Sequence, residues 1–294
     1  MTRVTNIHGL PSPLVEAIIN DDYDRGDVDI SVTGLLNPPR ISALAEKYAD
    51  DLVEDVSERI WLLLGKSVHA TIERTSSYGI SEERMFTECN GWKVSGQFDH
   101  LSLHTESGRT TLYDWKVTSV WTLVYGEGRI REWEEQLNLY ALLLHDVKGI
   151  DVDNLEIIAI LRDWQQSKAK EDGDGGNYPA QAVRAIPLSL WTIDEQRAFM
   201  AERVQLHQAA RQKLPLCSDE DRWAKPTKYA VYGYTKAGTR KVRADRVFDD
   251  YSSALDLASR TGGEVEERRG DQWTRCKAYC PVAAYCDQFM EGSN

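Results

Sequence analysis

The sequence predicts an α/β protein in which a mixed β-sheet flanked by helices is followed by a small C-terminal subdomain. Apolar residues recur at three- and four-residue steps from Ile41 to about Thr75, the pattern of one kinked helix or of two successive helices. The pattern then changes to that of strands over Met85–Glu88, Lys93–Leu103 and Thr110–Val117. Helical and strand patterns within one stretch of chain are typical of a sheet covered by helices.

The rest of the chain extends this pattern and then departs from it. We expect a helix over Glu132–Leu144, a buried strand over Leu155–Leu161, a mobile polar loop over residues 165–178 and a helix from about Thr192 to Lys213. Beyond Pro215, we expect a hairpin of Lys228–Tyr234 with Arg240–Phe248, and a helix over Tyr251–Ser259. The chain therefore divides into an N-terminal segment (1–40), a core (41–216) and a C-terminal subdomain (217–294).

Composition excludes several classes of protein. The chain has 294 residues and a net charge of −12, which argues against a protein that coats nucleic acid over its whole surface. No run approaches the roughly 18 apolar residues of a membrane span, and the N-terminus lacks the pattern of a secretion signal. We therefore expect a cytoplasmic protein with no membrane partner. Its five cysteines, an odd number, favour a metal or cluster site over a disulfide framework.

Two carboxylates and a lysine stand out among the expected strands. Asp99 lies in one strand, and Asp114 and Lys116 end the next, which is its hairpin partner. Antiparallel pairing can bring the two carboxylates together to share Mg²⁺ or Mn²⁺, ions that prefer oxygen ligands. Lys116 lies two residues after Asp114 and so points to the same face of the strand. A divalent ion beside an ammonium group suits phosphodiester hydrolysis, although a D-x-K tripeptide alone is usually a surface charge pair.

Two expected helices add polar residues in a matching order. Gly65 and His69 lie upstream on one helix, with Glu73 one turn further along the same face. Gln136 and Tyr140 lie downstream on another helix, also one turn apart. Each group alone is typical of an ordinary helix face, and it is their order around the carboxylates and the lysine that singles them out.

Taken together, these residues resemble the RecB-type branch of the PD-(D/E)xK nuclease superfamily. The marks of that branch are G-x-x-x-H on a first helix, a G-x-x-D strand, a D-x-K or E-x-K strand, and Q-x-x-x-Y on a following helix. The matching residues are Gly65 and His69, Gly96 and Asp99, Asp114 and Lys116, and Gln136 and Tyr140. The resemblance covers about Ser31 to Leu144 and implies a restriction-endonuclease-like core.

The resemblance also implies metal-dependent cleavage of DNA and a role for each residue. The implied catalytic residues are Asp99, Asp114, Lys116, Gln136 and Tyr140, with Lys116 as the catalytic lysine and Gln136 and Tyr140 positioning it or the DNA strand. The implied ligands of Mg²⁺ or Mn²⁺ are His69, Asp99, Asp114 and the backbone carbonyl of Trp115. Glu73 is a weaker candidate, for a second ion or for a hydrogen bond to the site.

Three cysteines lie close together near the C-terminus, at Cys276, Cys280 and Cys286. A tetrahedral zinc site or a cubane cluster needs a fourth thiolate. We choose Cys217, because it lies where the chain leaves the core and would tether the subdomain, and we interpret Cys89 as structural.

The cluster-bearing relatives, which include CRISPR-adaptation nucleases, hold a 4Fe-4S cluster on three C-terminal cysteines and one earlier cysteine. In those relatives the earlier cysteine precedes the G-x-x-x-H helix, where this chain has none. The Leu-Pro-x-Cys pattern that ends at Cys217, before a basic hairpin, looks more like phage-encoded members, which would place the protein in the host cytoplasm. Zn²⁺ is the alternative to the iron-sulfur cluster, because the number of thiolates does not separate the two.

One segment of the subdomain is strongly basic. Residues Lys225–Arg246 carry seven basic residues and one acidic residue, whereas the rest of the chain carries 28 basic and 46 acidic residues. Tyrosines alternate with the cations, a combination that suits single-stranded nucleic acid; the alternative is a solvated edge hairpin. The candidate DNA-binding residues are Lys228, Tyr232, Lys236, Arg240, Lys241 and Arg243.

The sequence therefore predicts a Mg²⁺- or Mn²⁺-dependent deoxyribonuclease. By analogy with the relatives, it would be an exonuclease on single-stranded or frayed DNA in recombination or DNA processing, with a helicase or recombination protein as a possible partner. The alternative is a DNA-binding module with a structural metal cluster and an inert nuclease-like core. The ordered presence of both carboxylates, the lysine and the glutamine argues against that alternative.

Overall fold

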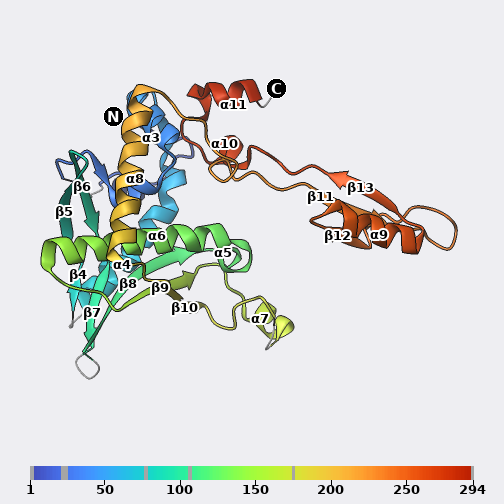
Figure 1. The fold of residues 1–294 in the computed structure, drawn as a ribbon, viewed down its shortest axis with the longest axis horizontal. Coiled ribbons are helices and arrows are strands. Elements are labelled where there is room, and N and C mark those ends of the chain that lie inside the picture. The colour runs from blue at the N-terminus through green and yellow to red at the C-terminus, as the bar shows by residue number, and fades with distance from the viewer. Residues whose placement is uncertain (1–2, 21–25, 76–78, 105–107, 174–175, 293–294) are drawn as a thin grey trace. The chain divides into compact units, whose positions relative to one another are not determined.

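The computed structural model describes residues 3–20, 26–75, 79–104, 108–173 and 176–292 (Figure 1). The chain forms two compact units, one of Met1–Ala43 with Ala49–Leu214 and the other of Leu44–Tyr48 with Pro215–Asn294. Within the described residues, no helix combines the length and the apolar character needed to cross a bilayer.

The first unit contains the sheets and the long helices. Its strands are β1(Arg3–Thr5), β2(Ile30–Ser31), β3(Val53–Asp55), β4(Ile80–Ser81), β5(Arg84–Cys89), β6(Trp92–Gln97), β7(His100–His104), β8(Arg109–Thr118), β9(Asn154–Leu161) and β10(Val183–Leu188). Its helices are α1(Ser12–Ile19), α2(Val32–Leu36), η1(Val56–Arg59), α4(Ile60–Thr75), α5(Val120–Tyr125), α6(Glu127–Leu143), the π-helical turn η2(Leu144–Lys148), α7(Gln166–Asp172) and α8(Ile193–Gln212). The helix α3(Pro39–Lys47) begins in this unit and ends in the other.

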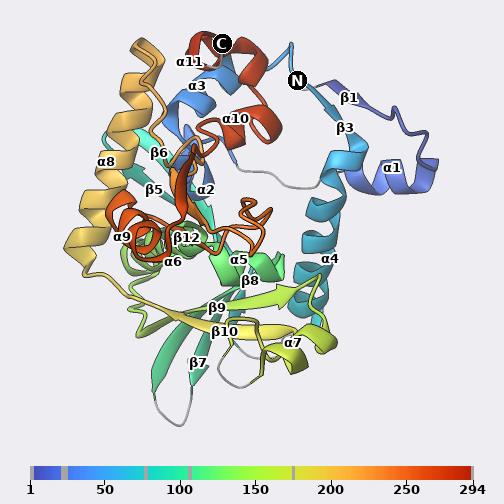
Figure 2. The same cartoon turned by 90° about the vertical axis from the view of Figure 1, so that its right-hand side faces the viewer.

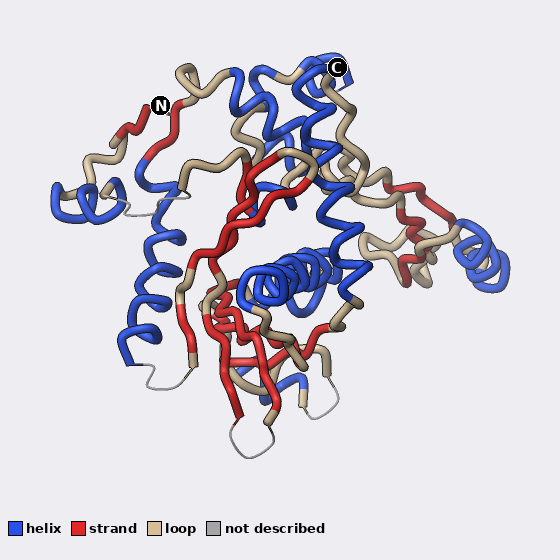
Figure 3. Tube along the Cα trace, turned by 60° about the vertical axis from the view of Figure 1, so that its left-hand side comes forward, coloured by secondary structure: helices blue, strands red, loops and turns tan. Residues whose placement is uncertain are grey.

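A five-stranded mixed sheet forms the middle layer of this unit. Its strand order is β10-β9-β8-β7-β4; β8 and β9 are parallel, and the other neighbours are antiparallel. The parallel connection from β8 to β9 runs through α5 and α6, as parallel pairing requires. In Figures 2 and 3, α4 lies on one side of these strands and α6 on the other. The expected mixed sheet flanked by helices is confirmed.

The chain passes from one sheet to the next at Phe98 and Asp99. Strand β6 belongs to a separate sheet of order β2-β6-β5, whereas β7 begins at His100 in the five-stranded sheet. Because His100 pairs with Tyr113, Asp99 comes next to Asp114 of β8. The single strand expected over Lys93–Leu103 is thus two strands, and Asp99 lies at the junction between them.

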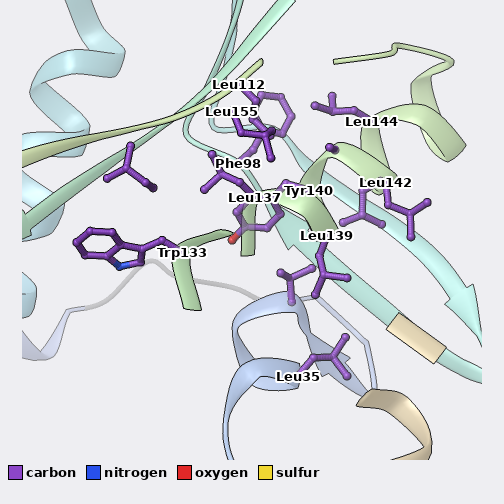
Figure 4. Packing of buried hydrophobic residues seen from close by; sticks show 14 of the residues in the cluster. Leu35, Phe98, Leu112, Trp133, Leu137, Leu139, Tyr140, Leu142, Leu144 and Leu155 are labelled. Carbon is purple, nitrogen blue, oxygen red and sulfur yellow. The ribbon is translucent and has the colours of Figure 1, made fainter. Parts of the chain in front are cut away.

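The core of the first unit is centred on α6 (Figure 4). Apolar side chains along one face of α6 and the start of η2 are buried: Trp133, Leu137, Tyr140, Ala141 and Leu144. Leu139, Leu142 and Leu143 are buried as well, because the other faces of α6 pack against α2 and α8. The helix is therefore enclosed on several sides, which fixes the position of any polar group that it carries.

Two connecting segments of the first unit differ in how well local sequence predicts them. The turn between β5 and β6 is Asn90-Gly91, with φ values of 50° and 76°, and a two-residue hairpin of this kind favours this dipeptide. The mobile loop expected over residues 165–178 was wrong in part, because Gln166–Asp172 forms the helix α7. The Trp164 indole NH donates to Pro179 O, and this bond closes the segment that contains α7.

The second unit has a small sheet and a cysteine-containing tail. Its elements are β11(Lys228–Tyr232), β12(Arg246–Phe248), α9(Tyr251–Thr261), β13(Glu264–Arg268), α10(Thr274–Ala278), η3(Ala283–Tyr285) and α11(Asp287–Gly292). The strand order is β12-β11-β13, and Val231, Ala254 and Ala258 form the core beneath α9. The strand expected over Arg240–Phe248 is short, and the acidic strand β13 was not expected at all.

The two glycines of the motifs differ in what they allow. A Cβ at Gly96 would lie 2.5 Å from Leu143 Cδ1 and 3.0 Å from Tyr140 Cε1, so only glycine lets α6 approach β6 this closely. At Gly65, within α4, nothing lies within 4 Å of the added Cβ. Gly96 is therefore required by packing, whereas Gly65 is not.

We expect Gly96→Ala to lower the free energy of unfolding by about 1–3 kcal/mol, the usual result of overpacking. Gly65→Ala should instead raise it by about 0.5–1 kcal/mol, because alanine favours a helix interior over glycine. Urea denaturation of the full chain would measure both. Equal stability of the two variants would contradict this account of the packing.

Candidate functional site

Three side chains from separate elements converge at one point. His69 comes from α4, Glu82 from the link between β4 and β5, and Asp99 from the junction of β6 and β7. The His69 Nδ1 atom lies 3.5 Å from Glu82 Oε1 and 3.5 Å from Asp99 Oδ1. One ligand atom of each residue lies within 4.8 Å of the others, a spacing that could hold a metal ion.

Each of these carboxylates is held by its second oxygen. The Gln97 amide donates to Glu82 Oε2 over 2.7 Å, and the Trp115 backbone NH donates to Asp99 Oδ2 over 2.7 Å. Glu82 has a left-handed φ of 51°, and its own NH donates to the Asp99 carbonyl. Backbone strain of this kind persists only where the surroundings enforce it. The remaining oxygens are thereby aimed at His69.

The ring of His69 is oriented by the backbone of strand β8. Its Nε2 atom lies 2.9 Å from the Trp115 carbonyl, which can accept a proton from it. With Nε2 carrying that hydrogen, Nδ1 faces the two carboxylates. A histidine that binds a metal typically donates its other NH to a carbonyl or carboxylate in this way.

The charges at this point are not balanced by the protein alone. Burial, followed by the charge of Asp114, raises the pKa of Asp99 to about 8. Burial would lower the pKa of His69, but its contact with Glu82 and the charges of Asp99 and Asp114 outweigh burial and raise it to about 9. Protons therefore supply positive charge here that a divalent cation could supply instead.

Asp114 provides a direct test of whether a cation fits. Its side chain is 2% exposed, and Oδ2 is a buried atom without a hydrogen-bond partner. The Lys116 ammonium lies 2.7 Å from that oxygen as an ion pair, but outside hydrogen-bond geometry. The donor set of two buried carboxylates beside Glu82 and His69 fits a divalent cation that prefers oxygen ligands.

The lysine is fixed by α6. Lys116 Nζ donates to Gln136 Oε1 over 3.0 Å, and the Gln136 amide donates to the Tyr140 hydroxyl over 2.9 Å. Gln136 and Tyr140 are both buried, so the ammonium is held from within the core. The Q-x-x-x-Y pair therefore positions the lysine.

A cleft of about 950 Å³ opens onto these residues. Its walls carry His69, Glu82 and Asp99, together with Trp61 and Lys66 of α4. The sixteen-residue helix α4 has no buried residue, so much of its apolar surface faces the cleft or solvent.

The motif residues are brought together, and a further acid joins them. His69, Glu82 and Asp99 are the residues that could hold a metal ion, and we call them the metal-binding group. Glu73 lines the cleft but is exposed and lies outside this group. Glu82 was not among the expected site residues because it belongs to no motif. Its one signal in the sequence was a carboxylate three residues before an expected strand.

The four candidate cluster cysteines all lie in the second unit. The Cys217 NH donates to the Gln288 side-chain oxygen, and the Gln288 amide donates back to the Cys217 carbonyl, which ties Cys217 to α11. Burial raises the pKa of the Cys276 thiol, and the nearby Cys280 and Cys286 raise it further. No disulfide joins the five cysteines, all of which are described, and Cys89 packs against the core of the first unit.

Among the described residues, no three cysteine sulfurs come within 4.8 Å of one another.

Three of the seven basic residues of the basic segment Lys225–Arg246 form ion pairs in the described structure, two of them with acids that lie outside the segment. Lys228 pairs with Asp249, Lys241 with Asp245, and Arg240 with Glu266. The ring of Tyr232 is buried, with the Arg240 guanidinium 3.7 Å from its centroid. Lys236 and Arg243 make no ion pair within the described part of the chain.

Comparison with known proteins places this geometry in a family. A model of the PD-(D/E)XK nuclease superfamily matches residues 34–287. No curated protein matches the sequence. Among solved structures, SSO0001 is 14% identical with a TM-score of 0.43, over 66% of this chain and 82% of that one. A candidate exonuclease from Eubacterium rectale is 16% identical with a TM-score of 0.32, over 51% of this chain and 54% of that one.

The family match spans the junction that carries Asp99, the strand β8 that carries Asp114 and Lys116, and the helix α6 that carries Gln136. The chain belongs to the PD-(D/E)XK nuclease superfamily.

Proposed function

We propose that this nuclease hydrolyses DNA phosphodiesters with the help of a divalent cation, Mg²⁺ or Mn²⁺. The observation that carries the proposal is the convergence of His69, Glu82 and Asp99, one ligand atom of each lying within 4.8 Å of the others. The buried carboxylate of Asp114 raises the pKa of Asp99, and a divalent cation would relieve the repulsion between these two carboxylates.

Different residues would bind the cation and stabilise the charge on the phosphate. His69, Glu82 and Asp99 lie close enough together to hold the cation, with the Trp115 carbonyl orienting His69. Asp114, whose charge acts on Asp99, would add a further ligand. A bound divalent ion lowers the pKa of water and stabilises negative charge on the phosphate. Lys116, held by Gln136, would place its ammonium beside the attacked phosphate and stabilise the charge that develops there.

The finer proposal concerns the mode of cleavage. We propose exonucleolytic action on single-stranded or frayed ends, in recombination or DNA processing with a helicase or recombination protein. Its support is the resemblance of the motifs to the RecB-type branch. The cleavage experiment below reports polarity and strand preference at the same time.

Lys116→Ala should lower the rate of cleavage by about 10²–10³-fold with the fold intact, because a preorganised charge-stabilising group is lost. The measurement is a time course on end-labelled single- and double-stranded DNA with Mg²⁺, Mn²⁺ or EDTA. Lys93→Ala, at an exposed lysine of β6, serves as the matched control. Full activity of Lys116→Ala would contradict the role of the lysine, and undiminished cleavage in EDTA would contradict the need for a metal ion.

Glu82→Gln should weaken Mn²⁺ binding by about tenfold or more, since even indirect partners of a metal ligand contribute that much. Glu73→Gln removes the same charge from the wall of the same cleft and should change affinity by less than about threefold, because Glu73 lies outside the metal-binding group. Calorimetric titration with Mn²⁺ separates the two. A larger loss of Mn²⁺ affinity in Glu73→Gln than in Glu82→Gln would identify Glu73 as the metal ligand.

We also propose that Cys217, Cys276, Cys280 and Cys286 hold a 4Fe-4S cluster. Support comes from the two hydrogen bonds that tie Cys217 to Gln288 of α11 and from the closeness of Cys280 and Cys286 to Cys276, whose pKa they raise. Protein purified anaerobically should contain iron and sulfide, and Cys286→Ser should lose both while Cys89→Ser keeps them. Stoichiometric zinc without iron would establish the alternative.

A further inference from the structure

Several exposed aromatic side chains stack with basic side chains near the C-terminal end of strand β8. Trp61 of α4 is 55% exposed, and the Arg162 guanidinium lies 4.2 Å from its ring centroid. Trp121 and Tyr125 of α5 are 42% and 79% exposed and stack on each other at 5.7 Å, with Lys168 Nζ 5.0 Å from the Trp121 ring. We call these five residues the aromatic rim.

The rim is one continuous feature because the ends of β8 and β9 join its parts. The Arg162 NH donates to the Thr118 carbonyl at the end of β8, and Asp163 accepts from Val120 NH at the start of α5. Figure 2 shows the end of β9 between α4, α5 and α7, the three helices that carry the rim's other residues. The rim therefore borders the C-terminal end of the strand that contains Asp114 and Lys116.

The cations of the rim differ from those of the basic segment. Within the described residues, Arg162 and Lys168 stack on indole rings and make no ion pair. The nearest acid, Asp163, accepts from Ser119 Oγ and Val120 NH, both over 2.7 Å. The rim thus offers positive charge and aromatic faces together.

The rim is also held in place. Tyr178 packs edge-on against Trp121 with centroids 6.0 Å apart, and its hydroxyl accepts from Gln165 NH. Exposed aromatic rings that are already oriented lose little freedom when a flat ligand stacks on them.

The rim is continuous with the cleft that contains the metal-binding group. Trp61 and His69 both line that cleft and lie eight residues apart on α4. At 1.5 Å per residue they are separated by about 12 Å along the helix axis. Stacked nucleotides at about 3.4 Å each would cover that distance in three or four steps.

We propose that the aromatic rim binds single-stranded DNA, with a base three or four nucleotides from the scissile phosphate stacked on Trp61. This inference rests on the proposed nuclease function and names the surface that carries the strand. Arg162 contacts the backbone between Trp61 and the Trp121–Tyr125 pair, on which further bases stack. Aromatic stacking with tracking cations is the general mode of binding single strands without sequence preference.

The test measures binding of oligothymidylates with the metal chelated, at several salt concentrations. Trp61→Ala should weaken binding by about 5- to 100-fold, the loss of one base–aromatic stack, without changing the salt dependence. Trp61→Phe should restore affinity to within about threefold of wild type. Arg162→Ala should reduce the slope of log affinity against log salt by about 0.7, the value for one phosphate contact on a single strand.

The matched control is Arg211→Ala. Arg211 of α8 also stacks on a tryptophan, with its guanidinium 4.5 Å from the Trp92 ring, but neither residue lines the cleft. This variant should keep the affinity and the salt slope of wild type. Wild-type affinity of Trp61→Ala for oligothymidylates would overturn the inference. So would equal losses of affinity in Arg162→Ala and Arg211→Ala.

Cleavage by the wild-type protein, measured in parallel with Mn²⁺, keeps the two proposals apart. If wild type cleaves DNA and Trp61→Ala binds it normally, the inference about the rim fails and the nuclease proposal stands. If wild type does not cleave DNA with any divalent metal, the nuclease proposal itself fails.

Discussion

Repulsion between the buried carboxylates of Asp99 and Asp114 is the interaction around which the site is built. The pairing of β7 with β8 forces them together, and burial removes the water that would screen them. The surrounding groups compensate for this repulsion: the ring of His69 faces Asp99, and the ammonium of Lys116 faces Asp114. Gln136 and Tyr140 fix the lysine from the enclosed helix α6, so the geometry of the site is tied to the packing of the core. A fold that buries α6 therefore also sets the distance between a cation site and an ammonium group.

The sequence was most informative where chemistry and local geometry coincide. The spacing of Gly96 and Asp99, of Asp114 and Lys116, and of Gln136 and Tyr140 follows from strand and helix periods, and these residues do converge. Glu82 escaped prediction because its position depends on a left-handed turn and on a hydrogen bond from Gln97, which comes from a different strand. Glu73 was proposed because a spacing of one helical turn from His69 can be recognised in a sequence. The contact of Glu82 with Asp99 joins two loops between strands, and no sequence spacing reveals it.

The basic segment shows what a count of charge along the chain leaves out. The count gave a strongly positive hairpin, but Lys228 and Arg240 are paired with Asp249 and with acids of β13, which lie outside the counted range. Strand pairing brings Glu264 and Glu266 beside Tyr232 and Ala230, so the local charge is a property of the sheet and not of the segment. The same reasoning explains why β13 escaped prediction, because its many glutamates are favourable only next to cations that lie elsewhere in the chain.

The helix α4 supplies His69 and one wall of the cleft, yet it buries no side chain completely. Core positions tolerate few substitutions because each change of volume costs stability, whereas half-exposed positions tolerate many. Residues on this wall can therefore be exchanged during evolution at little cost to folding, while β8 and α6 preserve the reactive groups. Enzymes built on this scaffold could diverge in the nucleic acid that they accept through changes along a single helix, without passing through unstable intermediates.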